Sequence, residues 1–299
     1  NLNLGQVEVE DGVIYHKTEY RERRDHFAYF ACSDEISGYD TQRKEFIGLY
    51  NGFESPQVVV KGESNNSFAH GWSPIGSHHV KVSLAPGASK QITFILGYQE
   101  NPKDQKFDPP GSQIINKVGA KDTFSKFLVP ENAEKAFEEL KAYWTEKLST
   151  YTVSSPCEHT NRMMNIWNPY QNMVTFNLSR SASYFESGIG RGMGFRDSTQ
   201  DILGFVHIIP ERVRERLLDL AATQLNTGGA FHQYQPLTKR GNDAVGSNFN
   251  DDPHWLIFAT AEYLKETGDY AILDELVQYE NEEGSEQTLY HHLKKAVQY

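Results

Sequence analysis

Cysteine is scarce in this sequence, and its scarcity excludes several kinds of protein. Only two cysteines occur in 299 residues, Cys32 and Cys157, and they lie far apart in the chain. They provide neither a disulfide framework nor the short spacing of a zinc site. The eleven histidines show no ligand spacing either. We therefore expect no bound metal, and the two cysteines favour a reducing, cytoplasmic location.

Long apolar runs and an excess of basic residues are also missing. No stretch is long and apolar enough to span a bilayer, and residues 1–10 are polar and acidic rather than signal-like. The chain has 29 Lys and Arg against 40 Asp and Glu, a net charge of −11, whereas nucleic-acid-binding proteins usually present a basic face. We expect neither a nucleic-acid nor a membrane partner. The 38% hydrophobic and 12% aromatic content predicts a packed core.

Residues 1–105 predict part of a β-sandwich, because short strand-like runs alternate there with turn residues. The pair Asp11-Gly12 is a hairpin turn signal. The strand candidates are β-branched or alternate in hydrophobicity: residues 7–9, 12–15, 26–32, 58–60, 79–84 and 91–97. The segment opens directly on strand-like sequence, so we expect the earlier strands of a larger sandwich to be missing.

Residues 106–155 predict a linker that contains a connecting helix. Residues 101–121 are rich in Pro, Gly, Lys and Asp, as linkers and surface loops are. A helix is expected from Pro130 to about Ser149, with its stripe packed on one of the two domains that it joins. The stripe has the three-four spacing of a buried helix face: Ala133, Ala136, Phe137, Leu140, Tyr143, Trp144 and Leu148.

From residue 156 to residue 299 the sequence predicts helices in pairs. They are expected at residues 161–178 with an interruption at Pro169, at 199–207, from Pro210 to a stop at 226–229, at 252–267, at 270–279 and at 285–299. Asp252 is a candidate N-cap, with Pro253 at the first helical position. The long loop 228–251 is of a length that is usually functional. Helical hairpins with polar loops at one end predict an (α/α) barrel whose site lies among those loops.

The stretch Tyr184–Asp201 is the strongest candidate for a binding site, because it places charged residues among four glycines. Glycine allows close backbone approach to a ligand, and arginine presents a planar fork of donors. The alternative is a surface turn held by ion pairs. No hydrophobic strand precedes the glycines, so the stretch is not a dinucleotide fingerprint. The charged residues are Glu186, Arg191, Arg196, Asp197 and Asp201.

Five stretches resemble a known family: Glu186–Ser198, Gln200–His207, Ile209–Arg212, Ala230–Arg240 and Asn250–Leu256. They are similar to the cellobiose phosphorylases, which are the inverting disaccharide phosphorylases of glycoside hydrolase family 94. The resemblance implies part of a β-sandwich, a helical linker and the first part of an (α/α)6 barrel. It also implies that this chain is an interior portion of a longer protein.

The resemblance implies phosphorolysis with inversion, in which cellobiose and inorganic phosphate give α-glucose 1-phosphate and glucose. Phosphate is a substrate, and no cofactor is implied. An inverting hydrolase needs an acid and a base, but phosphate is already an anionic nucleophile, so only the acid is needed. The family is also often a homodimer. Alternatives are a chitobiose or β-glucan phosphorylase of the same family, a glucoamylase-like hydrolase and a non-catalytic carbohydrate-binding fragment.

Three residues match the family's ligand contacts. Arg180 matches its phosphate-binding arginine, and Arg191 and Asp197 match residues that bind the sugar lost as sugar phosphate. Without the resemblance, Arg180 could be a helix-end ion pair and Asp197 a salt bridge to Arg196. We expect Arg196 itself to be structural.

No catalytic residue is assigned in this chain. The family's general acid is the aspartate of a Trp-Asn-Asp motif, which the sequence does not contain. Phe249-Asn250-Asp251 lies in an earlier loop, so neither Asp251 nor Asp252 is named as the acid. We expect the acid beyond Tyr299, and no turnover by the 299-residue chain alone.

Overall fold

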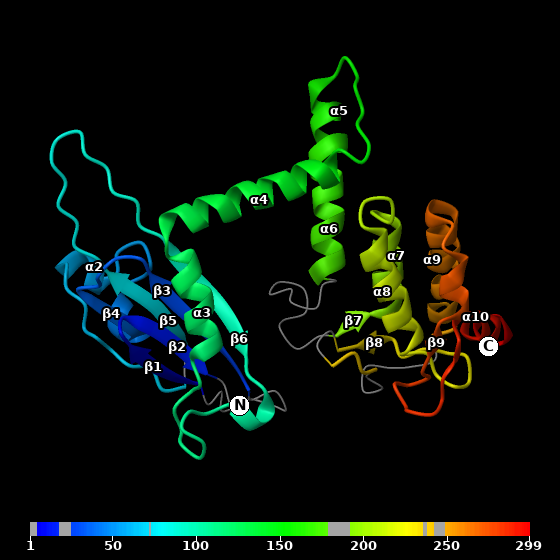
Figure 1. Ribbon diagram of the computed structural model, residues 1–299, viewed down its shortest axis with the longest axis horizontal. Helices are drawn as coiled ribbons and strands as arrows, with labels where there is room; N and C mark the ends of the chain where they lie inside the picture. Colours follow the sequence, from blue (N-terminus) through cyan, green and yellow to red (C-terminus); the bar gives the residue numbers. More distant parts are fainter. Residues whose placement is uncertain (1–4, 18–24, 72, 179–191, 236–237, 242–248) are drawn as a thin grey trace. The chain divides into compact units, whose positions relative to one another are not determined.

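The computed structural model describes residues 5–17, 25–71, 73–178, 192–235, 238–241 and 249–299. The chain divides into two compact units, residues 1–140 and residues 141–299. The first runs from blue to green and the second from green to red in Figure 1. The domain boundaries drawn from the sequence, 1–105, 106–155 and 156–299, stay a prediction.

An antiparallel four-stranded sheet is the centre of unit 1 (Figure 1). The predicted turn at Asp11 and Gly12 is confirmed, since Glu10 pairs with Val13 across it. Their φ angles of 51° and 78° are those that a tight hairpin turn needs. The strands in spatial order are β1 (Gln6–Glu10), β2 (Val13–Lys17), β3 (His26–Cys32) and β6 (Phe94–Glu100).

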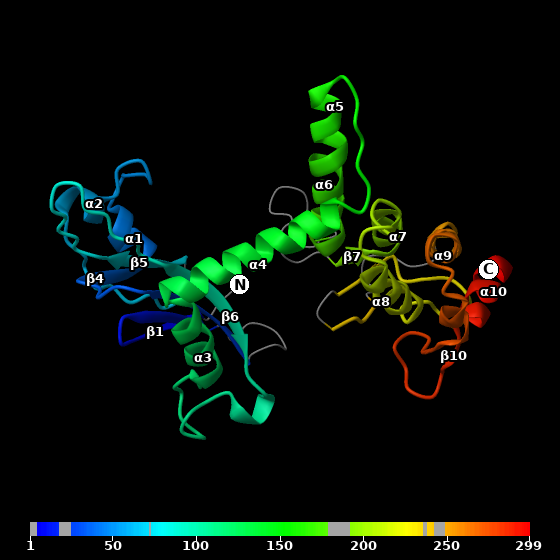
Figure 2. The same cartoon turned by 45° about the horizontal axis from the view of Figure 1, so that its top comes forward.

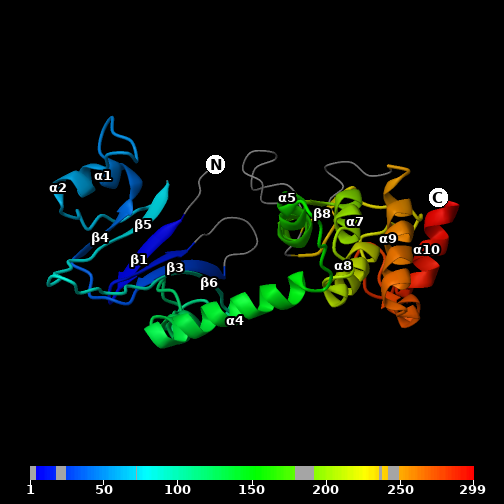
Figure 3. The same cartoon turned by 90° about the horizontal axis from the view of Figure 1, so that it is seen from above.

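One face of this sheet is covered by a helix, and the other is covered only in part, since Leu96 of β6 is 80% exposed. On one face, α3 (Val118–Phe127) packs Ala120 and Phe124 against the aromatic residues of β2 and β3. On the other face, Val7 and Ile14 pack with Ala69. Successive side chains of a strand point to opposite faces, which is why one strand supplies both clusters. Figure 3 shows β1, β3 and β6 together in this unit.

A second pair of strands corrects two sequence predictions. Strands β4 (Gly38–Gln42) and β5 (Pro74–His79) pair with each other, so the strand predicted at 79–84 ends where it was expected to begin. Residues 58–60 are helical within α2 (Gln57–Lys61), not a strand. Gly62 caps that helix in the left-handed region, so local capping outweighs the β-propensity of the valines. The other short helices are α1 (Arg43–Ile47) and a 3-10 turn (Lys103–Gln105).

The connecting helix α4 (Pro130–Leu148) has the predicted bounds, but its apolar stripe is largely uncovered in the described structure. Phe137 is 61% exposed and Leu140 is 53% exposed. Trp144 is partly buried against the core of unit 2. The three-four pattern therefore predicted the helix correctly and its burial wrongly.

Unit 2 is helical, as predicted, and the fold class of a partial β-sandwich followed by a helical region is confirmed. Figures 2 and 3 show its later helices side by side, and α9 contacts α7, α8 and α10. Its core includes Phe195, Ile202, Leu217 and Leu256, all fully buried. The helices are α5 (Glu158–Arg162), a π-helical turn (Met163–Trp167), α6 (Asn168–Leu178), α7 (Phe195–Leu203), α8 (Pro210–Ala221), α9 (Asp252–Thr267), a 3-10 turn (Tyr270–Asp274) and α10 (Leu289–Gln298).

Several predicted helix ends need correction. The interruption at Pro169 is confirmed, because a π-helical turn directly precedes α6. Helix α7 begins at Phe195 rather than at residue 199, and α8 ends at Ala221. The helix predicted at 270–279 shortens to a 3-10 turn, because the chain next forms β9 (Leu276–Val277), which pairs with β10 (Gln287–Thr288). Because of the same pairing, the last helix, α10, begins at Leu289 rather than at residue 285.

Candidate functional site

One of the three predicted ligand contacts falls within the described residues. Asp197 lies in the first turn of α7. Arg180 and Arg191 lie outside the described residues, so whether the three side chains share a cavity stays a prediction. The described part of the candidate site consists of the segments that surround Asp197.

A two-residue ladder positions the start of α7. Strand β7 (Met193–Gly194) pairs with β8 (Gln233–Tyr234), which brings the loop after α8 beside the first turn of α7. The backbone N–H of Phe195 extends this ladder by donating to the carbonyl oxygen of His232 at 2.9 Å. Loop 228–251 is thus anchored next to the residue that the resemblance assigns to sugar binding.

Two glycines of the predicted binding stretch make room for protein atoms. A Cβ at Gly192 would lie 2.7 Å from the carbonyl oxygen of Tyr234, so a side chain there would force β8 away. A Cβ at Gly194 would collide with Oδ2 of Asp197, whose carboxylate folds back over the glycine. These two glycines permit close packing of the ladder and of Asp197. The sequence had instead predicted that glycines in this stretch let the backbone approach a ligand.

Arg196 joins the starts of α7 and α9. Its Nη1 donates to Oδ2 of Asp251 at 2.7 Å, so its described partner is Asp251 and not the neighbouring Asp197. This ion pair agrees with a structural role for Arg196. The hydrogen bond from Arg196 lowers the pKa of the Asp251 carboxyl. A carboxyl held ionised in this way is poorly suited to donate a proton to a leaving group.

Asp252 lies at the first helical position of α9 and is fully buried. The predicted cap is corrected by one residue, because Asp251 occupies the N-cap position and makes no side-chain capping bond. Oδ2 of Asp252 lies 2.9 Å from Nδ1 of His232. Burial raises the pKa of Asp252, and the hydrogen bond with His232 opposes that rise.

The second oxygen of Asp252 is not satisfied by the described residues. Oδ1 is buried and has no hydrogen-bond partner among them. Such an atom costs about 1–3 kcal/mol relative to a satisfied one. The buried carboxylate of Asp252 therefore lowers the stability of the fold at this point, and it contacts the imidazole of His232 from the interior side.

Three segments close into a cycle around the first turn of α7. Phe195 donates to the backbone of His232, His232 contacts Asp252, and the adjacent Asp251 accepts from Arg196, which follows Phe195. Phe249 lies against the imidazole of His232, with ring centroids 4.3 Å apart and an interplanar angle of 34°. Sequence reasoning missed His232, although it had selected its loop as functional.

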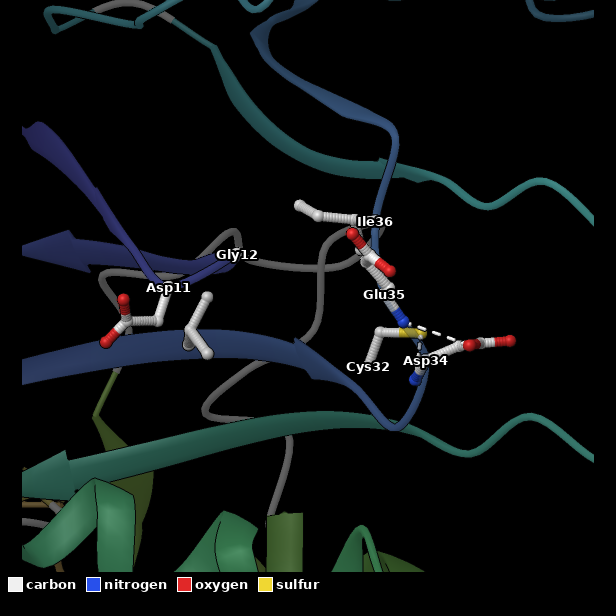
Figure 4. Close-up of a pocket in the computed structure, with 7 residues that line it drawn as sticks. Asp11, Gly12, Cys32, Asp34, Glu35 and Ile36 are labelled. Atoms are coloured by element: carbon white, nitrogen blue, oxygen red, sulfur yellow. Dashed lines mark hydrogen bonds between the residues drawn. The ribbon is translucent and has the colours of Figure 1, made fainter.

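A separate concavity lies in unit 1 and does not have the chemistry of a sugar or phosphate site. Its volume is about 210 Å³, and its lining includes Cys32, Asp11, Asp34 and Glu35, without an aromatic ring or an arginine. Figure 4 shows the three carboxylates on different sides of Cys32 rather than converging on one point. Acidic groups repel phosphate, so the candidate site remains the one at α7 and α9.

No three or more His, Cys, Asp or Glu side chains in the described ranges are grouped so as to hold a metal ion. Among the described helices, none combines the length and the apolarity required to cross a bilayer.

Family models match both parts of the chain. Residues 143–299 match the catalytic domain of the glycosyl hydrolase 94 superfamily, and residues 1–108 match the supersandwich domain of glycosyl hydrolase 94. The chain belongs to the glycosyl hydrolase 94 family. Family membership, expected from the stretches around residues 186–256, is thereby confirmed.

The relatives of this glycosyl hydrolase 94 chain act on different sugars. It is 28% identical over 295 residues to N,N'-diacetylchitobiose phosphorylase of Vibrio proteolyticus, covering 91% of this chain and 34% of that protein. It is 27% identical over 293 residues to solabiose phosphorylase of Paenibacillus borealis, covering 97% and 34%. It is 32% identical over 253 residues to cyclic beta-(1,2)-glucan synthase NdvB of Rhizobium meliloti, covering 84% and 8%.

These similarities have two consequences. The chain spans about a third of the length of the phosphorylases that it matches. The identities are too low and the substrates too varied to single out a cellobiose phosphorylase, so the likeness to that particular member of the family is not confirmed.

Proposed function

We propose that the protein to which this chain belongs is an inverting phosphorylase of a β-1,4-linked disaccharide, with cellobiose as the first candidate substrate. The observation that carries the proposal is the match of residues 143–299 to the glycosyl hydrolase 94 catalytic domain. Asp197, which the resemblance assigns to sugar binding, lies in the first turn of α7. Relatives that are phosphorylases of diacetylchitobiose and solabiose support phosphate as the attacking group.

The proposed reaction needs few groups from the protein. Phosphate attacks the anomeric carbon while the glycosidic oxygen leaves, so the protein must hold an anion, hold the sugar and protonate one oxygen. Arg180 would bind phosphate, and Arg191 and Asp197 would bind the glycosyl unit that becomes the sugar phosphate. The carboxylate of Asp197 can accept hydrogen bonds from two sugar hydroxyls. Asp251 is held ionised by Arg196, which argues against Asp251 as the general acid.

A second substrate has specific support. Two relatives, at 28% and 26% identity, are N,N'-diacetylchitobiose phosphorylases. An N-acetylated disaccharide is therefore the alternative to cellobiose within the same reaction.

A substrate panel tests the proposal. The full-length protein should release α-glucose 1-phosphate from cellobiose only when phosphate is present, or the corresponding N-acetylglucosamine phosphate from diacetylchitobiose. Equal cleavage with and without phosphate would identify a hydrolase and contradict the proposal. The 299-residue chain is the matched control, and we expect it to bind sugar without turnover.

The resemblance to the family also supports a cytoplasmic homodimer, which we include in the proposal. Sedimentation of the full-length protein tests the dimer, and a monomer at micromolar concentration would contradict it.

A further inference from the structure

The buried pair of Asp252 and His232 has no role in the reaction proposed above. Asp252 is fully buried, whereas the side chain of His232 is 20% exposed. The pair thus runs from the interior toward solvent, with the imidazole on the outer side. This arrangement lies at the start of α9, next to the first turn of α7.

Asp252 leaves the imidazole of His232 with one nitrogen for a ligand. Nδ1 contacts the carboxylate at 2.9 Å, which fixes the tautomer and the orientation of the ring. Nε2 has no hydrogen-bond partner in the part of the chain that the structure describes. A histidine held by one nitrogen on a buried carboxylate presents its other nitrogen as a hydrogen-bonding group.

Phe249 adds an apolar surface beside that nitrogen. Its ring is 46% exposed and packs against the imidazole with centroids 4.3 Å apart. A pyranose has an apolar face of C–H groups and an edge of hydroxyls, so it suits an aromatic ring beside a polar planar group. A phosphate or a carboxylate would gain nothing from the phenyl ring. The local chemistry therefore matches a neutral sugar.

The position of His232 indicates which sugar it would bind. Its carbonyl oxygen accepts from the N–H of Phe195, two residues before Asp197. We propose that Nε2 of His232 accepts a hydrogen bond from a hydroxyl of the glycosyl unit that is transferred to phosphate, with Phe249 against the apolar face of that sugar. Asp252 is the positioning residue. The identity of this sugar unit rests on the proposed function.

Two substitutions separate sugar binding from a purely structural role. In His232→Asn the amide reaches the place of Nδ1, so contact with Asp252 is retained and Nε2 is lost. In His232→Gln the longer amide reaches the place of Nε2, so the outer group is retained and contact with Asp252 is lost. The matched control is His254→Gln, which changes an exposed histidine in the first turn of α9, the helix that begins with Asp252.

Calorimetric titration of the full-length protein with glucose, methyl β-glucoside and N-acetylglucosamine, without phosphate, is the assay. We expect His232→Asn to bind the preferred sugar at least about 10-fold more weakly, equivalent to about 1.4 kcal/mol. We expect His232→Gln to stay within about 3-fold of the wild type, and the control to be unchanged. Equal losses in both variants would indicate a purely structural role, and a larger loss in His232→Gln would show that the contact with Asp252 is what matters; either result would overturn the proposal.

A spectroscopic measurement keeps the proposal testable if both variants unfold. In the wild-type protein, sugar should shift the Nε2 resonance of His232 and leave its Nδ1 resonance nearly unchanged. The absence of any such shift at saturating sugar would overturn the inference. Because none of these measurements needs turnover, sugar binding through His232 in a protein that lacks phosphorolysis would reject the proposed function and leave this inference standing.

Discussion

Acidification should destabilise unit 2 through His292, which lies in α10. The ring is fully buried and stacks on Tyr279 with centroids 3.9 Å apart. Burial lowers the pKa of His292 to about 4; the hydrogen bond with the carbonyl oxygen of Val277 opposes this in part, and His291 and Lys295 add smaller lowering effects.

The sign of the effect follows from proton binding by the two states. An unfolded histidine titrates near 6.5, so between pH 6.5 and pH 4 the unfolded chain binds more protons than the folded one. The contribution of His292 to the free energy of unfolding is therefore fully present above the unfolded pKa and is lost as pH drops through this window. From pH 7 to pH 4.5 the loss from this one residue is about 2–3 kcal/mol.

Urea unfolding of the wild type and of His292→Gln at both pH values measures the effect. The glutamine retains a polar group facing the carbonyl oxygen of Val277, which His292 contacts through Nε2 at 3.0 Å, and it does not titrate. We expect the variant to be less stable at pH 7 and to lose about 2–3 kcal/mol less than the wild type on acidification.

A contact with Gln224 also opposes the lowering of the pKa of His292, and it indicates which result would refute the prediction. Nδ1 faces Oε1 of Gln224 at 2.8 Å, and the amide nitrogen of Gln224 already donates to two carbonyls. A neutral ring has a hydrogen for only one of its two acceptors, whereas a protonated ring would satisfy both. If NMR titration placed the pKa of His292 at or above 6.5, these hydrogen bonds would outweigh burial and the reasoning would be wrong.

Three further substitutions in the full-length protein test the proposed site. Arg180→Ala should raise the phosphate requirement sharply, by about 2–5 kcal/mol in transition-state terms if the charge is desolvated; lowered stability with unchanged phosphate kinetics would assign it a structural role. Asp197→Asn should abolish most use of the donor sugar at an unchanged melting temperature, and normal kinetics would remove Asp197 from the site. Gly194→Ala should displace the Asp197 carboxylate and raise KM for glucose 1-phosphate by about 10-fold in the synthetic direction, whereas an unchanged KM would show that the displacement is harmless.

Local signals in the sequence predicted much of the fold. The turn at Asp11 and Gly12 and the bounds of α9 follow from chemistry within a few residues, and both are confirmed. The errors arose where distant segments compete. Residues 79–84 alternate like a strand, but β5 ends at His79, because a strand also needs a partner for its backbone groups. Phe137 in α4 shows that periodicity predicts a helix without showing what covers it.

The sequence alone determined the family, and it predicted the class of ligand and a functional role for the loop before α9, because these depend on residue types and their spacing. The tertiary structure alone decided that Asp252 faces His232, that Arg196 faces Asp251, and that Gly194 makes room for Asp197. The first two pairs join residues up to 55 positions apart in the sequence, whereas Gly194 and Asp197 are near neighbours in the sequence. Which side chains meet across such distances depends on how α7, α9 and the β7–β8 ladder pack, and that packing is a property of the whole core rather than of any motif.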